Sequence, residues 1–527
     1  MANTRPNIIV ILVDDMGFSD IGCFGAEIAT PNLDALAAQG VRQTQFYNCA
    51  RCCPTRASLQ TGCHPHRAGI GHMVNDNGHP SYRGFLREDL PTVAERLRAV
   101  GYCTWMSGKW HVGGEYPVHQ SEKWSMAGDP GHPIPTQRGF DRYYGTLCGA
   151  GSYFTPQTLF DQDHFVDLRT LPKGYYYTDE LGVRAAGFVD EAVDAGKPFL
   201  GYLTFTAPHW PLHAPEADIA AYRGKYREGW DVLRQRRLRS LVDQGLLPAD
   251  QALSQRDEKS KPWEEAQDQA WEDERMAVYA AQITAMDRAV GILVDRLKDR
   301  GVFEDTLIVF CSDNGGCAEF LREDGKRGVW PEFYGGPMPD GYQCKVGNTP
   351  GVAPGTNNTF MSYDLPWSNA SNTPFRKFKS WTHEGGISSP LIACWPKGLP
   401  AGVIRHSQGH IIDFGATACA LAGADSSGMD GVDLTPAWRD GGEVVRSEPL
   451  CWEHQGHSAV RDGTWKVVRA SNAQPWELYD IGADRIEETD LAAKHPEIVA
   501  RLNAIYEAWA ERCGVLPFPL AKQGARG

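Results

Sequence analysis

The sequence lacks long apolar runs. No stretch of eighteen consecutive apolar residues occurs anywhere in its 527 residues, so no transmembrane helix and no membrane partner are predicted. The first apolar run, NIIVILV at residues 7–13, has only seven residues and is ended by Asp14 and Asp15. A run of this length between polar residues is typical of a buried strand rather than of a signal peptide.

An excess of positive charge is also missing, and cysteine is used thinly. The chain carries 52 Lys and Arg against 66 Asp and Glu, a net charge of −14. This balance argues against nucleic acid as a partner but allows a local basic pocket for a small anion. Fourteen cysteines in so long a chain predict free thiols in a reducing compartment, and we expect the cytoplasm. Nothing in the sequence indicates the oligomeric state.

Short apolar runs alternate with helical patterns along the first three quarters of the chain. Residues 7–13, 102–107, 199–205 and 306–312 are apolar and predict buried strands. Helical periodicity covers residues 31–40, 89–101 and 276–301. This alternation predicts an α/β fold with a large mixed, mostly parallel sheet between layers of helices.

Changes in composition divide the chain into two predicted domains. Residues 1–400 form the expected catalytic α/β domain, with a charged helical insertion at about 216–275 and a Gly- and Pro-rich loop at about 323–374. A loop this long with few strand or helix signals indicates a lid or a pocket wall. Residues 401–527 predict a smaller α+β domain, in which GTWKVVRA and PWELYDI are antiparallel strands and residues 495–514 are a closing amphipathic helix.

Acidic and amide side chains follow two of the predicted strands. Asp14 and Asp15 come directly after the first strand, and Asp313 and Asn314 come directly after the fourth. An open parallel sheet forms its site at the carboxyl ends of its strands, so these four side chains can converge. Three carboxylates and an amide oxygen suit Ca²⁺ or Mg²⁺ better than zinc. The alternative is that each pair is only a polar exit from a strand.

The segment NCARCCPTRASLQTG, residues 48–62, concentrates three cysteines. Cys49 and Cys52 form a C-x-x-C pair, which raises a redox or zinc interpretation. A zinc site of this type needs a second such pair with suitable spacing, and the sequence has none. The same segment contains C-x-P-x-R at Cys52, Pro54 and Arg56. That pattern arises by chance in roughly 0.06 of chains of this composition, so alone it is only suggestive.

Basic side chains follow the other two predicted strands. Lys109 and His111 lie just beyond the second strand, and His209 lies just beyond the third. A single Lys or His is more often solvated or structural, but four strand ends with charged groups predict cations facing the acids across one rim. Lys379 in FRKFKSWTHEGG is a further candidate, with Arg376 and Lys377 as the alternatives in the same basic run.

Taken together, these motifs resemble the sulfatase family, and bacterial arylsulfatases of the alkaline phosphatase superfamily in particular. The resemblance covers nearly the whole chain and its motifs occur in the family order. They are PNIIVILVDDMGFSDIGCFG, ATPNLDALAAQGVR, CCPTRASLQTG, GKWHVG, APHWPLHAP, SDNGG, HEGGISSPLI and WELYDI.

The resemblance implies that a maturation enzyme oxidises Cys52 to formylglycine, an aldehyde that forms a geminal diol in water. One diol oxygen would attack sulfur and give a covalent sulfated enzyme. The second oxygen would expel sulfate as the hemiacetal collapses, a step that an ordinary serine cannot perform. This chemistry requires Cys52 at the first position of C-x-P-x-R.

The resemblance also implies roles for the other residues. Asp14, Asp15, Asp313 and Asn314 would hold a divalent cation that also touches the modified Cys52; Ca²⁺ is expected, with Mg²⁺ or Mn²⁺ as alternatives. Arg56 and Lys109 would hold the formylglycine, and Lys109 and Lys379 would stabilise the sulfate oxygens. His111 would be the base for hemiacetal collapse. His209 would protonate the leaving oxygen, a role shared with Lys379.

Two features leave alternatives open. Cys53 follows Cys52 where the family more often has Ser or Ala, which makes a stray disulfide conceivable. The expected substrate is a sulfate monoester, and an aryl sulfate in particular. Related phosphonate monoester and phosphodiester hydrolases share the metal and the modified cysteine but generally lack the full set of Lys109, His111 and Lys379. A metal-binding sulfatase-like protein that never acquires the aldehyde and only binds anions is a third hypothesis.

The leaving group is not specified by these motifs. Trp110, Trp210 and Trp381 are candidates for aromatic walls around it, although core packing explains tryptophans equally well.

Overall fold

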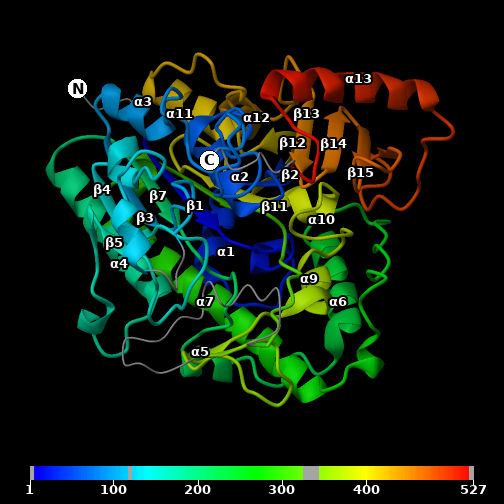
Figure 1. Cartoon of the computed structure of the whole chain (residues 1–527), viewed down its shortest axis with the longest axis horizontal. Helices are drawn as coiled ribbons and strands as arrows, with labels where there is room; N and C mark the ends of the chain where they lie inside the picture. The colour runs from blue at the N-terminus through cyan, green and yellow to red at the C-terminus, as the bar shows by residue number, and fades with distance from the viewer. Residues whose placement is uncertain (1–4, 117–120, 324–343, 521–527) are drawn as a thin grey trace, which may run out of the picture.

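The fold centres on a ten-stranded mixed sheet (Figure 1). The computed structural model describes residues 5–116, 121–323 and 344–520. The strands of the main sheet are β1 (Asn7–Val13), β2 (Val41–Tyr47), β3 (Cys103–Gly108), β4 (Arg142–Thr146), β5 (Leu159–Asp161), β6 (His164–Phe165), β7 (Phe199–Thr204), β8 (Thr306–Ser312), β11 (Ser388–Cys394) and β12 (Val403–His410). Their order across the sheet is β12-β2-β11-β8-β1-β7-β3-β4-β5-β6.

The strand β1 lies at the centre and explains why its sequence is a continuous apolar run. It pairs in parallel with β7 on one side and β8 on the other, so both of its faces are covered. Ile9, Ile11 and Val13 belong to one hydrophobic core, and the intervening residues of the strand belong to the core on the other face. The parallel block β8-β1-β7-β3-β4 contains all four strands predicted from apolar runs.

Helices cover both faces of this sheet, as predicted. One face is packed by α1 (Pro31–Ala38), α4 (Tyr177–Asp194) and α7 (Gln269–Asp299), and the other by α2 (Cys52–Thr61), α3 (Val93–Ala99), α11 (Asp413–Ala422) and α12 (Thr435–Asp440). Figure 1 shows these two layers on opposite sides of the sheet. Among the described helices, only α7 is long and apolar enough to cross a membrane by composition, and 83% of its apolar window is buried inside the protein.

A second, four-stranded antiparallel sheet lies near the C-terminus. Its strands are β13 (Leu450–His454), β14 (His457–Asp462), β15 (Trp465–Arg469) and β16 (Glu477–Asp480), in that order. The amphipathic helix α13 (Pro496–Cys513) covers one face of this sheet through Leu502, Tyr506 and Trp509. The predicted antiparallel strands and closing helix are therefore present. The domain boundary predicted near residue 400 stays a prediction, and β12 beyond it pairs with β2 in the main sheet.

The insertion and the long loop contain more regular structure than their composition indicates. The insertion holds α5 (Glu216–Ala220) and α6 (Gly229–Asp243), and α7 begins before residue 275. In the predicted loop at 323–374, residues 324–343 lie outside the described residues. The remainder contains the short strands β9 (Lys345–Val346) and β10 (Thr359–Phe360) and the helix α9 (Asp364–Ser371).

The helix α9 corrects the expectation of few helix signals in that loop. Trp367 of α9 is fully buried and packs against Trp230 of α6 with ring centroids 5.3 Å apart. The helix therefore forms through tertiary burial of its tryptophan, which overrides weak local propensity. A last short helix, α10 (Glu384–Ile387), precedes β11.

Candidate active site

The candidate active site lies at the carboxyl ends of four neighbouring parallel strands. Asp14 and Asp15 follow β1, and Asp313 and Asn314 follow β8. Lys109 follows β3, and the segment after β7 leads to His209. All of these side chains are buried. The structure thus brings together residues that are up to about 300 positions apart in the chain, as the sheet geometry predicts.

The acidic residues form a compact cluster of oxygen atoms. The side-chain amide of Asn314 donates to Asp15 Oδ1 at 2.7 Å, and the backbone N–H of Asp15 faces Asp313 Oδ1 at 3.3 Å. Two buried oxygens of this cluster, Asp14 Oδ1 and Asn314 Oδ1, have no hydrogen-bond partner. Buried oxygens without a partner are costly unless a cation or water satisfies them. The cluster therefore fits a hard divalent cation, for which Asp14, Asp15, Asp313 and Asn314 are the donors.

Cations surround the carboxylates on the inner side of the site. Arg56 Nη2 lies 2.9 Å from Asp313 Oδ2 and 3.5 Å from Asp14 Oδ2. Lys109 Nζ forms a close ion pair with Asp14 Oδ2. Burial acts to raise the pKa of Asp14, but Lys109, His209 and Arg56 outweigh it and hold that pKa below its ordinary value. Burial and the neighbouring Asp14 raise the pKa of Asp313 well above its ordinary value, as expected for acids that share one cation site.

Cys52 is the first residue of α2 and faces this cluster. All ten residues of α2 are buried, and Thr55 anchors the helix by donating its hydroxyl to the Asp313 carbonyl at 2.6 Å. The N-cap Arg51 has no side-chain capping bond, which leaves the positive end of the helix dipole directed at Cys52 and any bound anion. The Cys52 thiol occupies the position that a formylglycine would take in a modified chain.

His111 lies next to Cys52 as a neutral imidazole. Its burial, together with Lys109, lowers its pKa to about 4. The ring packs on Gly149, where a Cβ atom would lie 2.4 Å from Cε1 of the imidazole, so glycine is required there. A buried neutral histidine near a nucleophile can accept a proton at neutral pH. The position is therefore suitable for a general base.

His209 and Lys379 form the opposite side of the site. The Nδ1 of His209 donates to the Trp210 carbonyl at 2.6 Å, which leaves Nε2 as the acceptor facing Lys379 Nζ at 3.3 Å. Lys379 also pairs with Asp15 Oδ1 at 2.7 Å. Burial lowers the pKa of His209, and the positive charge of Lys379 adds to this effect. The pair can pass a proton to an oxygen that lies beside both groups.

The three basic side chains of the run around Lys379 point in different directions. Lys377 points to the insertion, where its Nζ lies 3.0 Å from Asp257, and Arg376 Nη1 donates to the Glu487 carbonyl at 2.6 Å. Of the three candidates, Lys379 is the one that the structure places against Asp15 and His209.

Several site residues have strained backbone conformations. Asp15, His111 and Ser380 have positive φ angles of 64°, 52° and 77°. Non-glycine residues in this region cost free energy and are kept where the surroundings dictate their position. Their clustering at one site marks it as the place where side-chain direction matters most.

Further residues next to the site were not predicted from the sequence. Arg51 Nη1 lies 2.9 Å from both Glu319 Oε1 and Ser380 Oγ, and Trp210 Nε1 donates to Glu319 Oε2 at 2.9 Å. Burial acts to raise the pKa of Glu319, but Lys379 and Arg51 outweigh it and keep the carboxyl ionised. Glu319 follows SDNGG by only a few residues, so proximity to that motif was the available signal.

The three tryptophans considered as aromatic walls differ in position. Trp110 is fully buried in the core and donates to the Pro133 carbonyl at 2.8 Å. Trp210 is also buried, against Phe360. Trp381 is partly exposed and lies against His457 with ring centroids 4.3 Å apart. Core packing accounts for Trp110, whereas Trp381 has a partly exposed ring.

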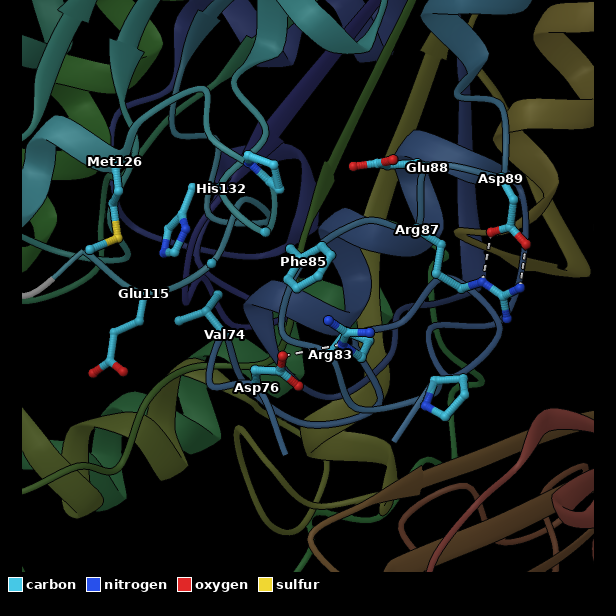
Figure 2. Close-up of a pocket in the computed structure, with 14 residues that line it drawn as sticks. Val74, Asp76, Arg83, Phe85, Arg87, Glu88, Asp89, Glu115, Met126 and His132 are labelled. Atoms are coloured by element: carbon cyan, nitrogen blue, oxygen red, sulfur yellow. Dashed lines mark hydrogen bonds and ion pairs between the residues drawn. The ribbon is translucent and has the colours of Figure 1, made fainter. Parts of the chain in front are cut away.

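An open pocket lies along the segment that follows His111, and none of the candidate site residues is in its lining (Figure 2). Its volume is about 830 Å³, and its lining includes Val74, Phe85, Arg83 and Glu115. The segment after His111 forms one wall, because the backbone at Gly113 bridges to Phe85. Within the lining, Arg83 pairs with Asp76 at 3.2 Å, as Figure 2 shows. Glu115 in the pocket lining therefore belongs to the same chain segment as His111.

Comparisons with known proteins identify the family. The Sulfatase family matches residues 6–424. An uncharacterized sulfatase of Schizosaccharomyces pombe is 32% identical and aligns over 98% of this chain and 95% of its own length. The arylsulfatase of Klebsiella aerogenes is 32% identical over 80% of this chain and 87% of its own length. Arylsulfatase A of Homo sapiens is 30% identical over 99% and 91%, respectively.

A solved structure agrees with the sequence comparisons. Ps i-CgsB, solved in complex with k-i-k-neocarrahexaose, has a TM-score of 0.67 and 27% identity, with 96% of this chain and 93% of that chain covered. The family match spans most of the chain, and the relatives align over most of its length. The chain therefore belongs to the sulfatase family, and its chemistry is that of a sulfate ester hydrolase.

Proposed function

We propose that this chain hydrolyses sulfate monoesters, with aryl sulfates among its substrates, at a formylglycine formed from Cys52. The observation that carries the proposal is the convergence of the Asp14–Asp313 oxygen cluster, Cys52 and the Lys379–His209 pair at one end of the sheet. The arylsulfatase relatives support the aryl substrate class.

The residues of the chain have separate tasks in this proposal. A formylglycine and a divalent cation, Ca²⁺ in the first place and Mg²⁺ or Mn²⁺ otherwise, would supply a diol nucleophile and polarise the sulfuryl group. Arg56 and Lys109 orient the residue at position 52. Lys109 and Lys379 place positive charge against the sulfate oxygens as their negative charge is redistributed in the transition state.

Two histidines handle protons on opposite sides of the sulfur. His111 is neutral, since its pKa is about 4, and takes a proton from the group at position 52. Lys379 donates toward Nε2 of His209, so this pair delivers a proton to the leaving oxygen. The burial of both histidines excludes bulk water from these transfers.

Burial also indicates when the maturation enzyme would act. Cys52 is only 2% exposed and lies within a fully buried helix. An enzyme that oxidises this thiol needs access to the surrounding peptide, so we propose that oxidation precedes the folding of α2. We also propose a reducing location such as the cytoplasm, because fourteen cysteines in a chain of 527 residues are typical of thiols rather than of a disulfide framework.

Peptide mass spectrometry tests the modification. Conversion of the thiol to an aldehyde makes Cys52 about 18 Da lighter. The peptide CCPTR, from protein made together with a maturation enzyme, should show this loss at Cys52, and the modified fraction should scale with turnover of an aryl sulfate. Cys52→Ser should abolish multiple turnover, whereas Cys53→Ser should leave it near the parental rate. Full turnover by protein with wholly unmodified Cys52 contradicts the proposal.

A matched pair of substrates tests the transferred group. The kcat/KM for an aryl sulfate is compared with those for an aryl phosphonate monoester and a phosphodiester that share one leaving group, so that only recognition of the transferred group differs. We expect the sulfate to be preferred because Lys109 and Lys379 supply a charge-rich pocket. Preference for a phosphorus ester would assign the chain to the phosphonate and phosphodiester hydrolases. Protein that stays unmodified at Cys52 and turns over no ester, although it is made together with an active maturation enzyme, would support the metal- and anion-binding alternative.

A further inference from the structure

Cys53 has contacts that the proposed chemistry does not use. Its Sγ lies 3.3 Å from Nε2 of His111 and 3.9 Å from Sδ of Met73. The Sγ of Cys52 lies 4.0 Å from the same sulfur. Cys53 is fully buried and Met73 is partly buried. A second thiol, a thioether and an imidazole thus all contact the Cys53 sulfur.

A disulfide does not explain this arrangement. A disulfide requires its sulfurs about 2.05 Å apart, whereas those of Cys52 and Cys53 are 4.0 Å apart on consecutive residues of α2. The stray disulfide considered from the sequence would therefore need the first turn of a buried helix to distort.

The distances instead match the ligand shell of a soft metal ion. Bonds of about 2.3 Å to sulfur and about 2.0 Å to nitrogen place the ligand atoms of a three- or four-coordinate ion about 3.5–4 Å apart. The contacts of Cys53 with His111, Met73 and Cys52 span 3.3–4.0 Å. Cys52, Cys53 and His111 each offer a ligand atom within 4.8 Å of the others. Because Cys53 Sγ lies 3.3 Å from Nε2 and 3.5 Å from Nδ1 of His111, the imidazole must turn to direct one nitrogen at an ion.

We propose that Cys53, His111 and Met73, joined by Cys52 while its thiol is unmodified, form a binding site for Cu⁺. Thiolate and thioether sulfur favour this soft ion, whereas Zn²⁺ is bound in proteins by Cys, His and carboxylate ligands rather than by Met. The positive charges of Lys109 and Arg51 act on Cys53, so a monovalent ion is less repelled than a divalent one. On binding, the Cys53 thiol releases its proton to solvent, and the Cu⁺–thiolate pair adds no net charge.

This site is distinct from the oxygen cluster, because it uses other side chains. Hard cations prefer the carboxylates of Asp14 and Asp313, whereas Cu⁺ prefers sulfur and imidazole. Occupation by Cu⁺ would hold the ring of His111 and prevent it from accepting a proton. The binding site rests on the contacts alone; only its effect on turnover rests on the proposed function.

Competition with a chromophoric chelator measures the binding directly. Cu⁺ is supplied as its bicinchoninate complex, under anaerobic and reducing conditions, to the full-length protein and to variants. We expect the parental protein to take up one more equivalent of Cu⁺ than Cys53→Ser does. Loss of a ligand should weaken affinity by at least 10- to 100-fold, because even the partners of ligands contribute that much.

Two further variants keep this result interpretable. Met73→Leu conserves side-chain volume and should weaken Cu⁺ affinity without affecting the fold, so it remains informative if Cys53→Ser does not fold. Cys49→Ser is the matched control: Cys49 lies on the same segment, but its Sγ contacts Ser58 Oγ at 3.4 Å, and its loss should leave Cu⁺ binding at the parental level. Equal binding by the parental protein, Cys53→Ser and Met73→Leu would overturn the site, and so would binding of Zn²⁺ in preference to Cu⁺.

The effect on catalysis is measured separately. Cu⁺ should stop aryl sulfate turnover by the parental protein, a chelator should restore it, and Cys53→Ser should continue to turn over at the same Cu⁺ concentration. Inhibition that is equal in Cys53→Ser would overturn the link to His111. If the parental protein had no sulfatase turnover, Cu⁺ binding would still be measured by competition, so failure of the proposed function is distinguishable from failure of the metal site.

Discussion

At the scale of single residues, the site is organised by pairs of opposite charge that are fully buried. Lys379 lies between Asp15 and His209, and Lys109 lies against Asp14. Buried pairs of this kind contribute less to stability than their Coulomb attraction indicates, because both charges lose their hydration. Their presence is better explained by the charge that the site must stabilise during the reaction.

The first residue-scale prediction concerns the four catalytic candidates beyond Cys52 and Arg56. Alanine substitution of Lys109, His111, His209 or Lys379 should lower kcat by about 10²- to 10³-fold for each charge-stabilising or proton-transferring group removed. Lys377→Ala is the matched control, since that side chain points to Asp257. Steady-state kinetics with an aryl sulfate, with circular dichroism to verify folding, measures the effect. Parental turnover in all four variants would show that the site lies elsewhere.

The second residue-scale prediction concerns the cation. Asp313→Asn should weaken Ca²⁺ binding, because it removes one negative oxygen donor from the cluster. A ligand present at 100 times its Kd stabilises the folded state by about 2.7 kcal/mol, so added Ca²⁺ should raise the Tm of the parental protein and have little effect on the variant. Metal analysis of the purified protein is the accompanying measurement. Stoichiometric zinc without calcium, magnesium or manganese would contradict the hard-oxygen assignment.

At the scale of elements, the parallel block of the sheet could be predicted, and its antiparallel side could not. β1, β3, β7 and β8 are apolar because both faces are covered, and this produces the runs visible in the sequence. The sequence of β2 shows no such apolar run, because it includes Arg42, Gln43 and Gln45. This strand is therefore not predicted from the sequence. Gln43 is buried and satisfied by Ser407 and Trp438 of distant segments. Polar residues that are paired only in the tertiary structure leave no local signal.

The motifs of the site could be assigned more fully than the elements that carry them. Four motifs follow strands whose apolar runs are visible, namely β1, β3, β7 and β8, so their convergence followed from the sheet rule. The segment with Cys52 follows β2, and Lys379 precedes β11, so these two were assigned from the family resemblance. Glu319 and Arg51 were missed because their roles depend on each other, and their contact joins residues 268 positions apart. Cys53 was noticed only as a departure from the family. Its contact with His111 depends on the packing of α2 against the segment after β3.

The element-scale prediction concerns the contact between the two sheets. Lys466 of β15 is fully buried between Glu384 Oε1 at 3.0 Å and Glu487 Oε1 at 2.7 Å. Lys466→Ala leaves both carboxylates short of a partner in the interior and should lower the free energy of unfolding by about 3–5 kcal/mol. Urea denaturation measures this loss.

An exposed ion pair provides the control for this variant. Lys397 pairs with Asp305 on the surface, where the two side chains are 57% and 55% exposed. Lys397→Ala should change the free energy of unfolding by no more than about 1 kcal/mol. Similar losses in both variants would mean that the buried network does not join the small sheet to the rest of the protein.

At the scale of the whole molecule, neutral histidines that are buried or partly buried occur in several segments outside the active site. Burial lowers the pKa of His64, His72, His213 and His457 to about 4 in each case, from an ordinary value of 6.5. His213 illustrates the cause: its Nε2 donates to the Thr359 carbonyl at 2.6 Å, and its Nδ1 faces the backbone N–H of Tyr153 at 3.4 Å. A second proton on this ring would face a donor in an interior without water.

These histidines predict that mild acid destabilises the protein. Because the folded-state pKa lies below the unfolded value, the unfolded chain binds more protons between about pH 6.5 and pH 4, and stability must fall as the pH is lowered through this window. Every tenfold difference in proton affinity between the two states is worth about 1.4 kcal/mol. Four carboxyls act in the opposite direction, because burial raises the pKa of Asp287 to about 6 and also raises those of Asp179, Glu272 and Asp313. They are outnumbered by the histidines with a lowered pKa, which also include His111, His209, His410 and His454.

Thermal unfolding at saturating Ca²⁺ and fixed ionic strength, from pH 7.5 to 4.5, measures the effect, and the Tm should decrease steadily below about pH 6.5. His213→Gln retains a donor and an acceptor but cannot take up a proton, so its Tm should decrease less than that of the parental protein over the same range. The difference between the two curves isolates one histidine from the titration of the cation site, which both proteins share. A Tm that stays constant or rises on acidification, or identical curves for the two proteins, would contradict the assignment of neutral buried histidines, because the linkage between proton uptake and unfolding permits no other sign.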